Sequence, residues 1–454
     1  MRQILQLPSL PNGTSQSNIA GILPLSSLIE FIDVETKLHC YELSGRGIAW
    51  NWPITPVGAR LILERCGPEK SKHYSVCLLD GDERTPPLQC IDMRFASVYV
   101  SASRFTVRTC IEIAPLLRTV QYDESDPFRL QRLDIIHVYS DPHLWGGEAG
   151  LPGVHHPQRS ILTKFNIKWA VILLVGWAIW AAAVVISIIC ACPLALSYLL
   201  TLPVTGLCIR SAFGRSARRL LVNKLGKDGQ YWRRSVIVAN HYNEIDWAIF
   251  IGDSRIINGV LNKPLLRSNH TTQELRSSKY KNSLKFFFRV LIAGQWGVIL
   301  AASAQQSWDA IFISVAIILC ACTSSFIFRA SDSVSSWLAS NGIGVEKMSV
   351  TFTGRRAMLS AMIAVNPDRD LKNQWLDPIL NASPGRTEWE EQVWKRLLDG
   401  VEPTGAPFLV ECIQEGVQKA SEINKWLLQR EIYHNVPPRP EPQTPFIITS
   451  PKSP

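Results

Sequence analysis

The chain has 454 residues and a net charge of +9, yet only 19% of its residues are charged. This length allows two or three structural units, and the slightly positive mean hydropathy fits soluble parts interrupted by membrane segments. The 11 cysteines include no CxxC pair. The composition therefore excludes a disulfide framework and favours free thiols in a reducing compartment.

Residues 1–160 are predicted to form a soluble domain that is mixed α/β or β-rich. The first 25 residues are not expected to be a signal peptide, because Pro8 and Pro11 interrupt the stretch after Arg2. Apolar runs and alternation of apolar with polar residues predict strands. These strands are expected at residues 74–79, 95–100, 105–113 and 133–138.

A transmembrane hairpin of two helices is predicted over residues 168–209. Residues 169–209 contain no charged side chain. As one helix they would extend about 62 Å at about 1.5 Å per residue, twice the roughly 30 Å of a bilayer core. Pro193 marks the turn, because proline interrupts a helix. An alternative is that residues 194–209, which contain Pro203, re-enter without crossing, leaving three spans in the chain.

A basic loop is predicted over residues 210–285. Between Arg210 and Arg289 the chain has 16 Lys+Arg against 5 Asp+Glu, a local charge of 16 − 5 = +11. A basic block between apolar segments indicates a cytosolic loop beside anionic lipid headgroups, so membrane lipids are the expected partner of residues 210–289. Nucleic acid is not expected, because the block carries no base-reading motif.

A second transmembrane hairpin of two helices is predicted over residues 286–328, with a polar turn at residues 305–309. The two short hairpin turns contain no Lys or Arg, whereas Lys164, Lys168, Arg210 and Arg329 flank the apolar runs. The positive-inside rule then places all soluble parts in the cytosol. The sequence assigns neither an organelle nor a protein partner.

A helical cytosolic region is predicted over residues 329–435, followed by a disordered Pro-rich tail at 436–454. Thr387 and Glu390 have the spacing of a capping box, which predicts a helix start at Thr387. Apolar residues then recur every three or four positions, which predicts one amphipathic helix. They are Leu409, Ile413, Val417, Ala420, Ile423 and Leu427.

The sharpest chemical pattern is residues 236–247, VIVANHYNEIDW, in which His241 and Asp246 follow an apolar run that is compatible with a strand. This resembles the first motif of the glycerolipid acyltransferases, NHxxxxD. The resemblance implies His241 as general base and Asp246 as the group that orients it. Two observations count against this resemblance. No FPEGTR-like segment is found, and only about 40 residues separate Trp247 from the next apolar run, too few for the α/β domain that surrounds such a site. The alternative is a loop in which both side chains make local hydrogen bonds.

Other chemistry is not expected. His155, His156 and the pair His137/His143 lack further ligands at suitable spacing, so no metal is predicted. The chain has no Gly-rich phosphate loop and no GxSxG elbow, so no cofactor is predicted. Transport is disfavoured, because only Arg289 is ionisable within the expected spans.

Four segments resemble uncharacterised multi-pass membrane proteins of filamentous fungi. They are residues 250–265 (FIGDSRIINGVLNKPL), 308–314 (WDAIFIS), 353–368 (TGRRAMLSAMIAVNPD) and 375–390 (WLDPILNASPGRTEWE). The resemblance covers roughly residues 160–435 and implies a membrane location. It implies no activity, so it assigns no catalytic residue.

The sequence therefore predicts an integral membrane protein, mainly α, with four transmembrane helices in two hairpins. A mixed α/β N-terminal domain and a helical C-terminal region complete the expected architecture. The leading hypothesis for function is a non-enzymatic scaffold or accessory protein. The alternative is a lipid acyltransferase-like enzyme that uses His241 and Asp246.

Overall fold

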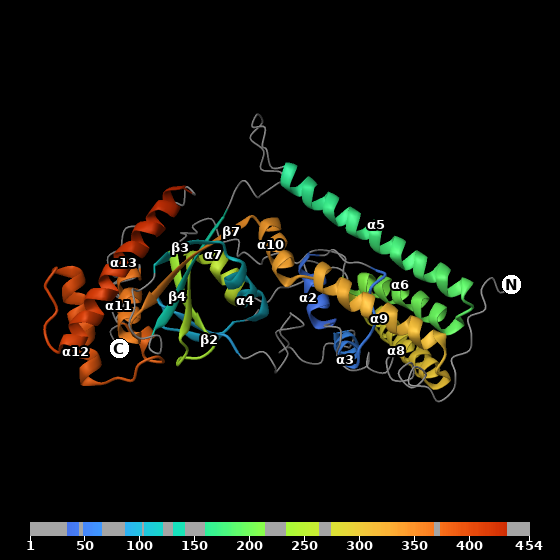
Figure 1. Cartoon of the computed structure of the whole chain (residues 1–454). Helices are drawn as coiled ribbons and strands as arrows, with labels where there is room; N and C mark the ends of the chain where they lie inside the picture. Colours follow the sequence, from blue (N-terminus) through green and yellow to red (C-terminus); the bar gives the residue numbers. More distant parts are fainter. Residues whose placement is uncertain are drawn as a thin grey trace. The chain divides into compact units, whose positions relative to one another are not determined.

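A computed structural model describes residues 34–44, 49–65, 87–101, 104–120, 130–140, 159–213, 233–262, 274–366 and 373–433. The strand expected at residues 74–79, the tail 436–454, and His143, His155 and His156 lie outside these residues. The chain divides into two compact units, and each unit is assembled from three separate segments of the chain. One unit is helical and the other contains a sheet (Figure 1).

The helical unit contains seven helices among the described residues. They are α2 (Val34–Ser44), α3 (Pro56–Arg65), α5 (Arg159–Ile189), α6 (Pro193–Phe213), α8 (Glu274–Gln305), α9 (Trp308–Ile327) and α10 (Ala330–Ser340). Helices α5 and α6 are joined by a turn in which Ala191 has φ 54°, and α8 and α9 by a turn in which Gln306 has φ 47°. Both predicted hairpin turns are thus confirmed as helix–helix connections. Helix α6 also continues through Pro203.

Three described helices are long and apolar enough to cross a membrane, by length and composition. Their apolar windows are Ala170–Ile189, Pro193–Ser211 and Ser283–Gln305. The sequence predicted four such helices. The fourth apolar segment, Trp308–Ser324 in α9, is shorter.

The helical unit also takes in part of the N-terminal region, which the sequence assigned to a soluble domain. Residues of α2 and Trp50 and Trp52 share one buried core with α6, α8 and α9. Close backbone approach makes this possible, because a Cβ on Gly206 of α6 would lie 2.0 Å from the Ala49 carbonyl oxygen. The prediction of one soluble domain over residues 1–160 is therefore wrong for the described residues 34–65.

The second unit is built on a seven-stranded mixed sheet with the order β2-β1-β5-β6-β4-β7-β3. The strands are β1 (Gln89–Asp92), β2 (Val98–Val100), β3 (Leu116–Val120), β4 (Gln131–Ser140), β5 (Arg233–Ala239), β6 (Asp246–Asp253) and β7 (Ile343–Phe352). Strand β4 pairs in parallel with β6 and antiparallel with β7. It confirms the strand predicted at residues 133–138.

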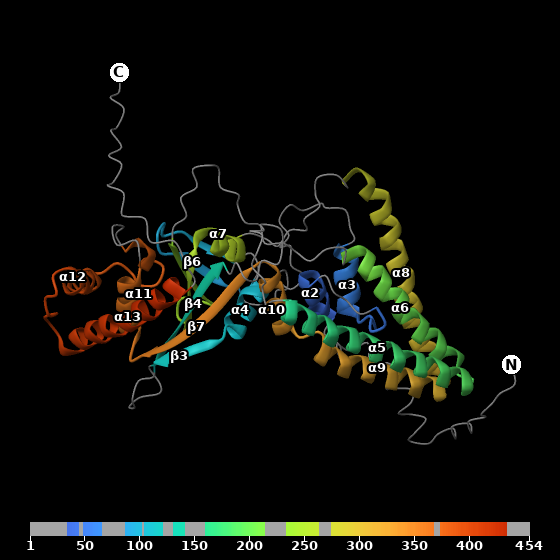
Figure 2. The same ribbon diagram turned by 90° about the horizontal axis from the view of Figure 1, so that it is seen from above.

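Helices cover both faces of this sheet. Helices α11 (Arg355–Val365), α12 (Pro384–Leu398) and α13 (Pro407–Tyr433) lie on one side, and α4 (Arg104–Ile113) and α7 (Ser254–Ile257) lie on the other (Figures 1 and 2). A π-helical turn, η2 (Asn258–Asn262), follows α7, and a 3-10 turn, η3 (Gln374–Leu376), precedes α12. The predicted apolar face of α13 is confirmed, because its residues join the core beneath α11.

Two predictions for this unit are wrong. Residues 105–113, predicted as a strand, form α4, because the buried positions Val107, Cys110 and Ala114 recur at helical spacing. The basic segment 210–285, predicted as a loop, contributes β5, β6 and α7, since the apolar residues of β5 and β6 are buried in the sheet. Only the last three residues of the strand predicted at 95–100 form β2. Within the described residues 329–366 and 373–433, β7 interrupts the predicted helices.

We expect Gly206→Ala to destabilise the helical unit, because the new Cβ would collide with the Ala49 carbonyl oxygen. That oxygen is a backbone atom and cannot move aside as the end of a flexible side chain can. Such overpacking costs about 1–3 kcal/mol. Thermal unfolding of the detergent-solubilised protein, followed by circular dichroism, would show a lower Tm.

The matched control is Gly294→Ala in α8, where an added Cβ meets no atom within 4 Å. The control should unfold at or above the parent temperature, because alanine favours a helix over glycine. An equal loss of Tm in both variants would contradict the close approach at Gly206.

Candidate functional site

The loop between β5 and β6 carries the two residues that the sequence singled out. The His241 side chain is 66% exposed, and its Nε2 lies 3.5 Å from Oε2 of Glu244. The Asp246 side chain is 58% exposed, and its Oδ1 lies 3.1 Å from Nε of Arg132. Among the described residues, no hydrogen bond or ion pair joins His241 to Asp246. The carboxylate nearest His241 is therefore Glu244, and the predicted His–Asp pairing is not formed here.

Sheet register explains the partner of Asp246. Strands β4 and β6 are parallel, and Arg132 is the register partner of Asp246. Opposite charges on neighbouring strands attract. Because both side chains are largely exposed, solvent weakens this attraction. Asp246 therefore meets a cation from the neighbouring strand.

Two arginines from distant helices fix the β5–β6 loop. Arg355, at the first position of α11, donates from Nη1 to Asn243 Oδ1 at 3.2 Å and from Nη2 to the Tyr242 carbonyl. Arg108 of α4 donates from Nη2 to Asn240 Oδ1 at 2.7 Å. The loop is thus held from two helices, which fixes the backbone on either side of His241.

The surroundings of Arg355 are partly apolar. Its guanidinium lies 5.6 Å from the centroid of the Trp247 ring, a cation–π geometry. Burial disfavours the charged form and lowers the pKa of Arg355 from its usual value. The sequence prediction missed Arg355, although a charged residue at the start of an apolar helix was a signal that could have found it.

The buried cysteines of the sheet unit are unsuited to nucleophilic chemistry. Burial raises the pKa of Cys90 and of Cys110 to about 12, and it also raises the pKa of Cys412. At neutral pH these thiols are protonated, whereas the thiolate is the reactive form. No group of three or more potential metal-ligating side chains is found among the described residues.

A second polar site lies among the apolar helices. Gln295 stands near the middle of the apolar window of α8. Its Nε2 donates to Thr205 Oγ1 of α6 at 2.9 Å and to the Trp52 carbonyl at 3.4 Å, and its Oε1 accepts from the Ile54 N–H at 3.1 Å. One buried side chain thus connects two helices to the extended residues between α2 and α3.

The same extended residues bind α9 through Asn51. Its Nδ2 donates to Thr323 Oγ1 at 2.8 Å and to the Cys320 carbonyl at 3.1 Å. Its Oδ1 accepts from Nζ of Lys37 at 3.0 Å, and that ammonium lies 5.4 Å from the Phe328 ring centroid. The side chains of Asn51 and Gln295 are both buried and hydrogen-bonded through their oxygen and their nitrogen atoms. We therefore assign them a structural role in holding the helices together.

A third contact joins the two hairpins directly. Asp309, in the first turn of α9, is buried, and its Oδ1 accepts from the N–H of Ala195 in the first turn of α6 at 2.9 Å. A carboxylate at a helix N-terminus satisfies an N–H that has no partner within its own helix and interacts favourably with the helix dipole. The two hairpins are thereby connected at the ends where α6 and α9 begin.

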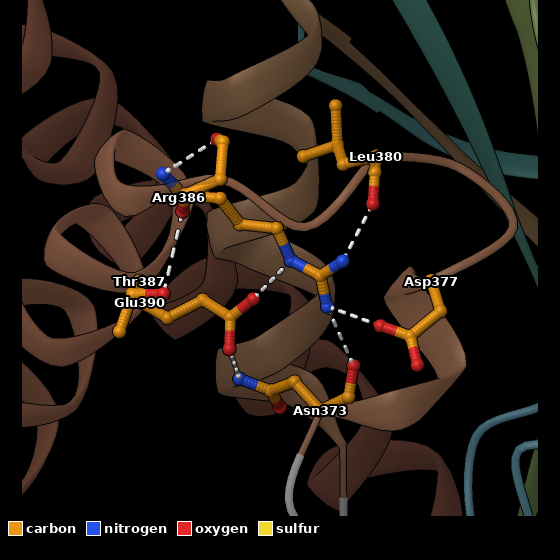
Figure 3. Close-up of polar contacts among 7 residues, drawn as sticks. Asn373, Asp377, Leu380, Arg386, Thr387 and Glu390 are labelled. Carbon is orange, nitrogen blue, oxygen red and sulfur yellow. Dashed lines mark hydrogen bonds and ion pairs between the residues drawn. The ribbon is translucent and has the colours of Figure 1, made fainter.

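The polar cluster around Arg386 is a packing feature rather than a site (Figure 3). The guanidinium binds Asp377 Oδ1 at 2.7 Å, Glu390 Oε1 at 2.5 Å and the Leu380 carbonyl at 2.5 Å. Glu390 is thus paired with Arg386, and the helix is capped earlier, by Ser383. The capping box predicted at Thr387 is therefore wrong, because α12 begins at Pro384.

Comparison of the chain with protein-family models, with curated proteins and with solved structures finds no match in any of the three. The resemblance to fungal membrane proteins therefore stays a prediction.

We expect Gln295→Leu to lower the stability of the helical unit. The substitution removes three hydrogen bonds and leaves the Ile54 N–H without its acceptor. An unsatisfied buried donor costs about 1–3 kcal/mol. The measurement is the Tm of the detergent-solubilised protein.

The control is Gln305→Leu at the exposed end of α8. It makes the same chemical change without the buried contacts and should leave Tm nearly unchanged. A Gln295→Leu variant as stable as the control would show that these hydrogen bonds do not hold the residues between α2 and α3.

Proposed function

We propose that this chain is a multi-pass integral membrane protein that holds a cytosolic sheet domain at the membrane surface and acts as a non-enzymatic scaffold or accessory protein. The observation that carries the proposal is the connectivity of the sheet. Strand β4 precedes α5, β6 lies between α6 and α8, and β7 follows α9. Strand β4 is hydrogen-bonded to both of the others.

This connectivity restricts the number of membrane crossings. Strands of one sheet lie on one side of a membrane, because a hydrogen-bonded sheet cannot extend through a bilayer as an open sheet. The chain between β4 and β6 must therefore cross an even number of times, and so must the chain between β6 and β7. Helices α5 and α6 form the first pair of crossings, and α8 requires a partner in the second pair.

That partner is α9. Its apolar segment is the shortest of the four, but the whole helix has 20 residues, which is about 30 Å at the usual rise. Four crossings in two hairpins satisfy the sheet, whereas three would separate β7 from β4. The charged flanks agree, because Arg210 lies in the last turn of α6 and Arg329 follows α9, whereas both hairpin turns lack Lys and Arg. By the positive-inside rule the sheet domain is cytosolic.

The basic segment favours anionic lipid as a partner of the same face. The local charge of residues 210–289 supports binding to headgroups on the cytosolic leaflet.

Protease sites introduced at the N-terminus, at Gln306–Ser307 and at Gly400–Val401 test the topology in sealed vesicles. With the sheet domain facing outward, we expect cleavage at the N-terminus and after Gly400, and protection in the α8–α9 turn until detergent is added. The acceptor triplets at Asn12, Asn269 and Asn381 should carry no glycan, because all three lie on the cytosolic side in this topology. Chain ends on opposite faces, or a glycan on Asn381, would refute the proposal.

The second hypothesis is the lipid acyltransferase-like enzyme that uses His241 and Asp246. The observation in its favour is Arg355, which brings a cation to the loop that carries His241. The observations against it are the pairing of Asp246 with Arg132 and the exposure of His241 to solvent. A general base needs a fixed partner that orients its ring.

The two hypotheses differ in the effect of His241→Ala. A scaffold predicts that acylation of lysophospholipids and the membrane lipid profile stay unchanged, as in the control Ile245→Ala from the same exposed loop. Loss of acylation in His241→Ala alone, at equal protein abundance in the membrane, would favour the enzyme.

A further inference from the structure

The turn between β1 and β2 presents an aromatic side chain to solvent. Phe95 is 59% exposed, and the Arg94 guanidinium lies 5.5 Å from its ring centroid. The next residue, Ala96, has φ 52°, a left-handed conformation that is uncommon for a residue with a Cβ. The backbone at Ala96, directly after Phe95, is therefore conformationally strained.

The buried side chain of Asp92 fixes the conformation of this turn. The Asp92 side chain is completely buried, and its Oδ1 accepts from the N–H groups of Arg94 at 2.8 Å and Phe95 at 3.1 Å. Its Oδ2 accepts from Nε of Arg234 at 2.7 Å and from Nη2 of the same guanidinium. The Asp92 N–H also donates to the Ser97 carbonyl at 3.0 Å. The exposed position of Phe95 is therefore a fixed feature of the domain.

Sheet register places the turn at one particular edge. Asp92 pairs with Val236 at the middle of β5, and the next residue, Met93, donates from its N–H to the Ser235 carbonyl, toward the start of β5. Arg233 pairs with Asp253 at the end of β6. Ser140, at the end of β4, pairs with Ile343 at the start of β7. The β1–β2 turn therefore lies at the end of the sheet where β4 ends and where β5 and β7 begin.

The chain runs from this edge to the apolar helices. After β4 the next element is α5, and before β5 the preceding element is α6. The link at β7 is the shortest, because α10 ends at Ser340 and β7 begins at Ile343. Helix α10 in turn begins three residues after α9 ends at Ile327. Along the chain, all three links therefore join this end of the sheet to the helical unit.

We infer that the β1–β2 turn is a lipid-contact site, in which Phe95 enters the boundary between headgroups and acyl chains and Arg94 binds lipid phosphate. An exposed aromatic ring and an arginine with an apolar stem suit this boundary, where one end of the site is apolar and the other is hydrated. The negative potential of the cytosolic leaflet attracts the guanidinium. This inference rests on the proposed membrane topology.

The sheet domain offers a matched control at its opposite edge. Ile245, in the β5–β6 loop, is 57% exposed, nearly the same as Phe95. It precedes β6, whose far end pairs with the start of β5. Its apolar surface should therefore face the cytosol.

Photo-crosslinking in the full-length chain tests the inference. A benzophenone amino acid replaces Phe95, Ile245 or Leu174, one position at a time, and carbonate-washed membranes are irradiated and analysed by mass spectrometry. Leu174 is an exposed residue within the apolar window of α5 and reports contact of that helix with lipid. We expect lipid adducts at positions 95 and 174 and none at position 245.

Each other outcome has a defined meaning. Lipid adducts at 174 without any at 95, or equal lipid adducts at 95 and 245, would overturn the lipid-contact site and leave the proposed topology standing. A protein adduct at 95 in place of lipid would also overturn it. Absence of lipid adducts at all three positions, including Leu174, would instead refute the membrane topology itself.

Discussion

The pairing of β4 with both β6 and β7 is the constraint on which the rest of this structure depends. These strands come from three parts of the chain that apolar helices separate. Strands β4 and β6 are mostly buried, and the buried residues of β7 lie in the same core, so none of the three is stable without its neighbours. The sheet therefore forms only when the segments that contain the apolar helices bring these three strands together.

In the helical unit the main constraint is that non-helical backbone, between α2 and α3, is buried among the helices. The described residues between α2 and α3 are not helical, and backbone groups of Asn51, Trp52 and Ile54 bond to side chains of the helices. Gln295 satisfies the Ile54 N–H and the Trp52 carbonyl, and Asn51 reaches three acceptors on α9. Away from water, such groups are tolerated only when protein atoms satisfy them. The glycine at 206 supplies the space, because its missing Cβ lets the Ala49 carbonyl approach α6.

The β5–β6 loop shows how tertiary neighbours decide the meaning of a local pattern. His241 and Asp246 have the spacing of a catalytic pair, but Asp246 begins a strand whose register sets it beside Arg132. Arg355 and Arg108 then fix the loop backbone through Asn243 and Asn240. None of these arginines is near the loop in sequence, so the spacing of His241 and Asp246 could not reveal them.

The sequence by itself determined the features that depend on local composition and periodicity. It predicted both hairpins of apolar helices with their turns, the strand β4 and the buried face of α13, because each is encoded by a continuous run or a regular spacing. It did not determine whether residues 105–113 are helix or strand, since their apolar pattern fits both periods. Only the tertiary structure decided that strands from the basic segment join β4 in one sheet, that Trp50 and Trp52 pack among the apolar helices, and that Asp92 is neutralised by Arg234. The physical reason is that these outcomes depend on contacts with residues far away in the chain, and such contacts cannot be predicted from the residues adjacent in sequence.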